Sequence, residues 1–230
     1  MQPANSRAPR VAALAATILA RRDLTNNPYL VSLADGSMDR QTFITTQEQF
    51  FYAVTFFPRP MAALVGRIPL PHQRLDILHN LLEEHGDLNE AAFHHTTFRE
   101  FLHRLDSDLS RLDTLALWPE LRAFNSVLTS ACVLDELEVG IGCMGIIEQA
   151  FATVSACIGS AVVARGWLST ERMVHYRLHA EIDQRHAEEF FAVIEPAWDD
   201  PRRRYLLEQG LELGAYIFDR LYRDLHLHSS

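Results

Sequence analysis

The chain contains no lysine, little cysteine and no segment that would divide it. All 21 basic residues are arginines, which we attribute to a biased genome and not to a mechanism. The 230 residues carry a net charge of −9, and so acidic a chain is a poor partner for nucleic acid. No Pro-, Gly- or Ser-rich linker interrupts a sequence that is 48% hydrophobic. We therefore expect a single domain over residues 1–230.

Three cysteines give no basis for a disulfide framework or a thiolate zinc site. Cys132, Cys143 and Cys157 lie in apolar helical stretches without paired spacing, so we expect reduced core residues. The apolar segment 11–20 is only about half as long as a bilayer-spanning helix and lacks the pattern of a cleaved signal sequence. We expect a cytoplasmic protein that does not enter a membrane.

Alternating apolar and polar residues never persist long enough to predict a strand, whereas helical spacing of apolar residues recurs almost everywhere. The sequence therefore predicts an all-α fold. Short connections between seven or more helices predict a compact bundle. The expected helices cover residues 9–22, 27–34, 38–67, 71–86, 92–105, 115–131, 135–164, 170–195 and 201–225.

Local signals mark several helix boundaries. Ser37, Ser169 and Asp200 are the expected N-caps of the helices that follow them. Pro58 and Pro60 lie inside the third predicted helix. Each removes a backbone donor and clashes with the preceding turn, so we expect a kink or break there.

Three potential metal ligands share one side of a predicted helix. His179, Asp183 and His186 stand in the stretch HAEIDQRH, and at about 100° per residue their offsets return to one stripe. Apolar neighbours predict that this helix is packed, where such a stripe would be costly to bury without a cation. The alternative is a solvated histidine-rich face, because the chain has 11 histidines.

Two other segments could supply further ligands. Glu148 is the only acidic residue between Glu138 and Arg165 in a long apolar helix, so it needs a partner, either a metal or a buried Arg or Tyr. The segment NLLEEHGDLNEAAFHHTTFREF offers more carboxylates and imidazoles than one site can use. Physical reasoning from the residues alone does not choose among them.

Together these motifs resemble the heme-oxygenase-like diiron oxidase and oxygenase superfamily, which shares its bundle with the PqqC oxidase and the TenA thiaminases. HAEIDQRH matches the family's His-x3-Asp-x2-His run, and Glu148 matches its second Glu. NLLEEHG resembles its Asn-Leu-x-x-Glu-Glu stretch, and HHTTFREF resembles its His-x3-aromatic-x2-Phe, which points to Glu84 and His94. QEQFFYAVTFFPRPMAAL resembles its aromatic helix, so the likeness extends from about residue 27 to about residue 225.

The resemblance implies a heme-oxygenase-like bundle of about seven core helices and a non-heme diiron oxidoreductase. Two iron ions, Fe(II) or Fe(III), would be bound, and O2 would be the co-substrate. We expect a small-molecule substrate, an amine or amino acid, oxidised by N-oxygenation or by oxidative C–C cleavage or decarboxylation. An external reductant could supply electrons, and we expect a homodimer. The implied metal ligands are Glu84, His94, Glu148, His179, Asp183 and His186.

The pairing of Glu84 with His94 requires an interrupted helix. On a continuous helix, ten steps would place the two residues about 80° and about 15 Å apart. We therefore expect a break or bulge near Gly86. Without it, Glu83 or His85 would compete for the role.

The substrate pocket is expected beside the third predicted helix. Arg59 could receive a substrate carboxylate through its planar fork, or it could be a surface ion-pair residue. His175, one turn before His179, could be a hydrogen-bond partner of a ligand or a simple helix-face residue. Five aromatic side chains would line the pocket or form its lid, ordinary core packing being the alternative: Phe50, Phe51, Tyr52, Phe56 and Phe57.

Several alternatives remain open. One is a metal-free or degenerate heme-oxygenase-like bundle that binds a small molecule or a protein partner without redox turnover. Another exchanges the metal, with manganese beside iron or with zinc alone, because carboxylate-rich sites accept several divalent ions. A subgroup resembling the chlamydial death-domain-associating protein makes p-aminobenzoate from its own tyrosine. Its two tyrosine positions hold Ile147 and His175 here, so we do not expect that reaction.

Overall fold

The computed structural model describes residues 6–229, and helices are the only regular elements in that range. The all-α prediction is therefore confirmed. Ten α-helices make up most of this part of the chain: α1 (Pro9–Arg22), α2 (Pro28–Asp35), α3 (Arg40–Phe56), α4 (Pro58–Arg67), α5 (Pro71–Glu84), α6 (His94–Arg104), α7 (Pro119–Thr129), α8 (Leu137–Ala164), α9 (Val174–Ile194) and α10 (Pro201–Ser229).

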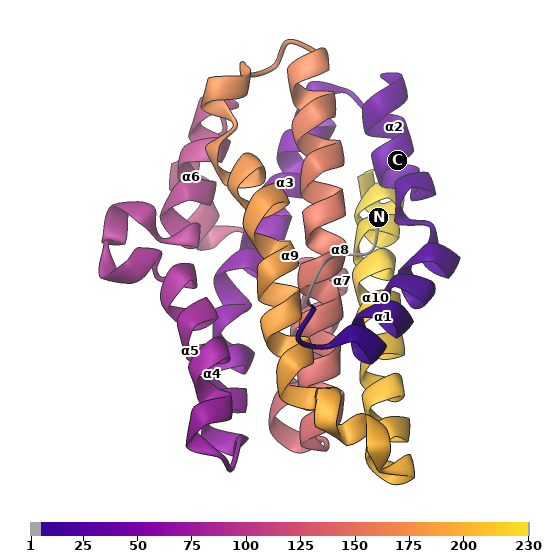
Figure 1. Cartoon of the computed structure of the whole chain (residues 1–230). Helices are drawn as coiled ribbons and strands as arrows, with labels where there is room; N and C mark the ends of the chain where they lie inside the picture. Colours follow the sequence, from indigo (N-terminus) through magenta and orange to yellow (C-terminus); the bar gives the residue numbers. More distant parts are fainter. Residues whose placement is uncertain (1–5, 230) are drawn as a thin grey trace.

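Helix α8 is the centre of the bundle. In Figure 1 it runs beside α9 and α10, and α2, α4 and α7 also pack on it. Its backbone approaches α10 so closely that a Cβ on Gly214 would lie 2.5 Å from the carbonyl oxygen of Cys143. Among residues 6–229, α8 alone is long and apolar enough to cross a bilayer by length and composition. Its central place in the core accounts for that composition.

The third predicted helix is two helices, as the prolines indicated. α3 ends at Phe56, and α4 begins at Pro58, where the missing N–H belongs to an unbonded first turn. The predicted N-cap of this region was wrong, because Asp39 takes that position instead of Ser37. The Asp39 carboxylate accepts a hydrogen bond from the Thr42 N–H at 2.8 Å, which satisfies a free donor of the first turn.

Two further N-caps were predicted, one for each of the last two helices. Ser169 precedes a 3₁₀ turn, and α9 begins only at Val174, so Ser169 does not cap α9 as expected. Asp200 does cap α10, because its carboxylate accepts hydrogen bonds from the backbone N–H groups of Arg202 and Arg203 at 2.8 and 3.0 Å.

The chain leaves its helical path directly after Glu84. Gly86, Asp87 and Leu88 have φ values of 53°, 53° and 69° and form one short turn, and a 3₁₀ turn over Glu90–Ala92 follows before α6 begins at His94. A Cβ on Gly86 would lie 2.5 Å from the backbone carbonyl carbon of Ala92. Only glycine fits this close approach at a positive φ. The expected break is confirmed, and it brings the start of α6 back to the end of α5.

Candidate metal centre

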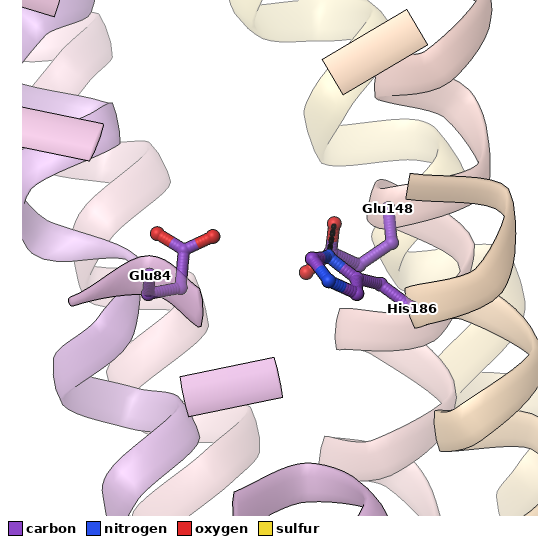
Figure 2. Close-up of side chains that lie close together, drawn as sticks. All are labelled: Glu84, Glu148 and His186. Atoms are coloured by element: carbon purple, nitrogen blue, oxygen red, sulfur yellow. Dashed lines mark ion pairs between the residues drawn. The ribbon is translucent and has the colours of Figure 1, made fainter. Parts of the chain in front are cut away.

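Six polar side chains from four helices meet inside the bundle, and none is more than 5% exposed. Figure 2 shows Glu84 on one side of the site, with Glu148 and His186 together on the other. The structure therefore brings together the whole set singled out from the sequence: Glu84 from α5, His94 from α6, Glu148 from α8, and His179, Asp183 and His186 from α9.

Two close pairs form the edges of this cluster. Oε1 of Glu84 lies 2.9 Å from Nδ1 of His94, which is possible only because the chain turns back after α5. On α9, Nδ1 of His179 lies 2.8 Å from Oδ1 of Asp183, one helical turn further on. Ligands held about 2.1 Å from one ion in octahedral geometry are about 3 Å apart, so both spacings suit neighbouring ligands.

His186 lies between Asp183 and Glu148. Its Nδ1 lies 3.7 Å from Oδ1 of Asp183 and 3.8 Å from Oε2 of Glu148. One potential ligand atom each from Glu84, Glu148 and His186 lies within 4.8 Å of the other two. These separations leave room for cations between the side chains.

Several ligand-type atoms at this centre lack hydrogen-bond partners. Within residues 6–229, five such buried atoms are Nδ1 of His94, Oε1 of Glu148, Nε2 of His179, Oδ2 of Asp183 and Nδ1 of His186. Burying polar atoms without partners is costly, and an ion is one of the few ways to satisfy them. Carboxylate oxygens and imidazole nitrogens are ligands that iron accepts, so the residues fit a metal of this class.

In the metal-free cluster, buried carboxylates raise the pKa values of neighbouring groups, so that protons supply the positive charge that a metal would bring. Burial lowers the pKa of His186, but interactions with Glu148 and Glu83 outweigh it and raise the pKa to about 10. Burial, together with the charge of Glu148, raises the pKa of Asp183 well above its usual value. Burial lowers the pKa of His179 to about 3, so its imidazole is neutral, which is the metal-binding form.

Glu83 and His85, the competing candidates, lie outside the cluster. Oε2 of Glu83 lies 2.8 Å from Nε2 of His186, and Arg185 donates two hydrogen bonds to the Glu83 carboxylate at 2.7 and 2.8 Å. A histidine that donates one N–H to a carboxylate presents its other nitrogen to a metal. His85 is exposed, and its Nδ1 lies 2.8 Å from the Leu81 carbonyl oxygen.

An internal cavity of about 40 Å³ touches the cluster at Glu84, Glu148 and His179. Phe50 and Phe57 from the expected aromatic wall line it. The rest of its lining is apolar and comes from four helices: Ala53 and Val54 (α3), Phe124 (α7), Ile147 and Phe151 (α8) and Phe218 (α10).

A wider surface groove of about 620 Å³ reaches Glu84 and His94 between α3, α4, α5 and α6. Phe51, Tyr52 and Arg59, expected near the substrate, line this groove. Phe56 instead lines an adjoining depression that also contains Tyr52 and Arg59. The predicted aromatic wall is therefore divided among three hollows.

His175 lines neither the cavity nor the groove. It is fully buried, its Nδ1 lies 3.1 Å from Oγ1 of Thr97, and its ring centre lies 4.3 Å from that of His179. Burial, followed by the charges of His179 and His94, lowers its pKa well below the usual value. The residue therefore packs behind the cluster as a neutral imidazole.

Sequence reasoning missed most of the cavity wall. Phe151 follows Glu148 by three residues, and this helical spacing could have identified it as facing the same way. Phe124 and Phe218 come from α7 and α10, far along the chain, and no local pattern marks them. Glu83 was singled out, but only as a rival ligand and not as the partner of His186.

Comparisons with known proteins agree with these features. A family model described as iron-containing redox enzyme matches residues 45–214. A protein named 4-aminobenzoate synthase from Nitrosomonas europaea is 23% identical over 199 residues, which are 82% of this chain and 79% of that protein.

Solved structures match over nearly the whole chain. A TenA homologue from Pseudomonas syringae pv. tomato has a TM-score of 0.75 at 18% identity, covering 97% of this chain and 93% of that one. A domain of unknown function with a heme oxygenase-like fold from Shewanella denitrificans has a TM-score of 0.74 at 18% identity, covering 95% and 90%. The heme-oxygenase-like fold expected from the sequence is confirmed.

Proposed function

Because this chain belongs to the family of iron-containing redox enzymes, we propose that it is a non-heme diiron oxidase or oxygenase that uses O2 to oxidise a small metabolite. The buried cluster of three carboxylates and three imidazoles carries the proposal, since five of its ligand-type atoms have no hydrogen-bond partner among residues 6–229. A metal-free bundle would gain nothing from so costly an arrangement.

The six clustered side chains would hold the two ions. Three carboxylates balance three of the four positive charges of two ferrous ions, which leaves a centre of charge near +1. Bound iron would supply electrons and open coordination positions for reducing O2, and the remaining electrons would come from the substrate or an external reductant. The apolar cavity wall excludes water from one side of the centre.

The surface groove is the proposed substrate site, because it is the wider hollow that reaches Glu84 and His94. The Arg59 guanidinium lies 5.8 Å from the centre of the Phe56 ring and forms no ion pair with the described residues. It is therefore available for a substrate carboxylate, as in an amino acid.

We do not propose 4-aminobenzoate synthesis, although the Nitrosomonas relative bears that name. The two tyrosine positions that this chemistry implies hold Ile147 and His175 here. Neither side chain can replace a phenol as a source of the aromatic ring. N-oxygenation and oxidative C–C cleavage or decarboxylation of an amine or amino acid remain the proposed reactions.

The decisive experiment is anaerobic loading with Fe(II) followed by exposure to O2, with visible absorption and Mössbauer spectroscopy. We expect two irons per chain and a transient absorption change after O2 is added. Binding of at most one iron, or no reaction of the iron-loaded protein with O2, would contradict the proposal.

A matched pair of variants tests which side chains hold the metal. His94→Ala should lower the iron stoichiometry, because it removes a buried imidazole of the cluster. His103→Ala, at an exposed position of the same helix, should still bind two irons. If His94→Ala still binds two irons, His94 is not a ligand, whereas absence of iron from both variants and from the unsubstituted protein would support the metal-free alternative.

A further inference from the structure

The internal cavity is apolar except where it meets the metal centre. Eight of its eleven lining residues are apolar, and five of those are phenylalanines. The three polar ones, Glu84, Glu148 and His179, all belong to the candidate metal centre. Cavities with purely apolar walls stay dry and take apolar ligands such as xenon or benzene, and the phenylalanine-lined part of this cavity has such a wall.

The size of the cavity restricts its occupant. A water-sized particle needs roughly 10–15 Å³ on this scale, so the cavity of about 40 Å³ holds about three such particles. Benzene occupies apolar cavities of about 150 Å³. An aromatic amine or a whole amino acid is therefore too large, whereas a diatomic molecule fits.

The cavity and the groove both reach the centre but have different linings. Their linings share Val54 and Glu84, and every other lining residue belongs to only one of them. The groove, at about 620 Å³, carries polar groups such as Arg59 and His95 beside its aromatic residues. It suits a substrate with charged groups, which the cavity could not solvate.

We propose that this internal cavity is a binding pocket for dioxygen, separate from the groove that receives the substrate. The proposal rests on the proposed function, in which O2 is the co-substrate. Dioxygen is small and apolar, so it gains by leaving water for an apolar wall, and it would be held beside Glu84, Glu148 and His179. The step is non-covalent binding alone, with no transfer of electrons or protons.

Xenon is the probe for this pocket, because it is apolar and needs no metal. Crystals of the metal-free protein pressurised with xenon should show a xenon atom among Phe50, Phe124 and Phe151. Absence of xenon from this position under saturating pressure would overturn the proposal.

A substitution that fills the cavity tests whether the cavity contributes to the reaction with O2. Ala53 is a small buried residue of the lining, and Ala53→Leu adds three carbons to it. We expect the xenon peak to disappear and the second-order rate constant for oxidation of the Fe(II)-loaded protein by O2 to fall about tenfold, with iron stoichiometry unchanged. An unchanged rate constant would overturn the proposal.

The matched control is Ala161→Leu, at a buried alanine outside the lining. Along α8 it lies thirteen residues from Glu148, or about 20 Å, so xenon binding and the O2 rate constant should stay at their original values. If Ala53→Leu does not fold, Phe218→Leu enlarges the cavity and should raise xenon occupancy. Unaltered occupancy in that variant would count against the pocket.

The two proposals fail in different ways. If xenon fills the cavity but the iron-loaded protein does not react with O2, the proposed function fails, and the dioxygen pocket fails with it. If the protein consumes O2 normally while xenon stays out, or while Ala53→Leu reacts at the original rate, only the pocket is overturned.

Discussion

Two neighbouring glutamates contact the metal centre in different ways. Glu84 is 5% exposed and faces His94, whereas Glu83 contacts His186 from the outer side together with Arg185. Neighbours on a helix are about 100° apart, so only one of the two can point into the centre. The carboxylate of the other sets which nitrogen of His186 faces inward.

Removing the Glu83 carboxylate should weaken metal binding without removing a ligand. We expect Glu83→Ala to lower Fe(II) affinity by about 10–100-fold, because Nε2 of His186 loses its carboxylate partner. Glu83→Gln keeps an oxygen acceptor, so its Fe(II) affinity should fall by less. Affinity is measured by competition with a chelator under anaerobic conditions.

The control for this prediction is Glu181→Ala, at an exposed position on α9. It changes the net charge by the same amount and should leave affinity unchanged. Equal affinities of the Glu83→Ala and unsubstituted proteins would show that Glu83 does not orient His186.

At the scale of elements, the break between α5 and α6 decides whether the centre can form. Gly86 has a φ of 53° and lies against the backbone of Ala92. The turn allows Glu84 and His94, ten residues apart, to approach within 2.9 Å. A straight helix would hold them about 15 Å apart.

Gly86→Ala should therefore damage both stability and the metal site. The added Cβ meets the carbonyl carbon of Ala92 at 2.5 Å and disfavours the positive φ, which together should cost about 2–3 kcal/mol of unfolding free energy. Iron stoichiometry should also fall, because His94 moves away from Glu84. Urea unfolding and iron analysis measure the two effects.

Gly166→Ala separates backbone strain from the effect on the site. Gly166 has a φ of 67°, but a Cβ there meets nothing within 4 Å. The unfolding free energy of this variant should fall by about 1 kcal/mol, and the variant should keep two irons per chain. If both variants keep full iron content, the turn at Gly86 is not what assembles the centre.

At the scale of the whole molecule, the centre couples folding to pH. In the metal-free protein the folded state raises the pKa of His186 from 6.5 to about 10 and raises that of Asp183 as well. Both shifts stabilise the folded state at low pH, and this stability is lost as pH rises through the raised values. Metal ions compete with the same protons for the ligand atoms, so the affinity for metal increases as pH rises.

The melting temperature of the metal-free protein should fall as pH rises from about 6.5 to about 8.5, relative to a His186→Gln variant. The difference in melting temperature between metal-loaded and metal-free protein should widen over the same range, because binding releases fewer protons. Differential scanning calorimetry with Co(II) as the metal measures both trends. Parallel curves for loaded and metal-free protein would contradict this linkage.

Site residues that depend on local sequence patterns could be predicted, whereas those that depend on contacts between distant segments could not. The stripe of His179, Asp183 and His186 depends only on the period of one helix, and the sequence was sufficient for it. The buried carboxylate of Glu148 followed from its apolar helix. The choice of Glu84 came from the family resemblance and not from physics, because the face that α5 buries depends on the helices around it.

Helical period, proline positions and the ligand stripe are local properties, and for these the amino-acid order was enough to specify the all-α class, the break at Pro58 and one half of the candidate centre. Tertiary structure alone decided which glutamate faces inward, how α6 returns to α5, and that phenylalanines from distant helices enclose an apolar cavity. These features depend on contacts between residues far apart in the chain, and such contacts leave no periodic signal in the sequence.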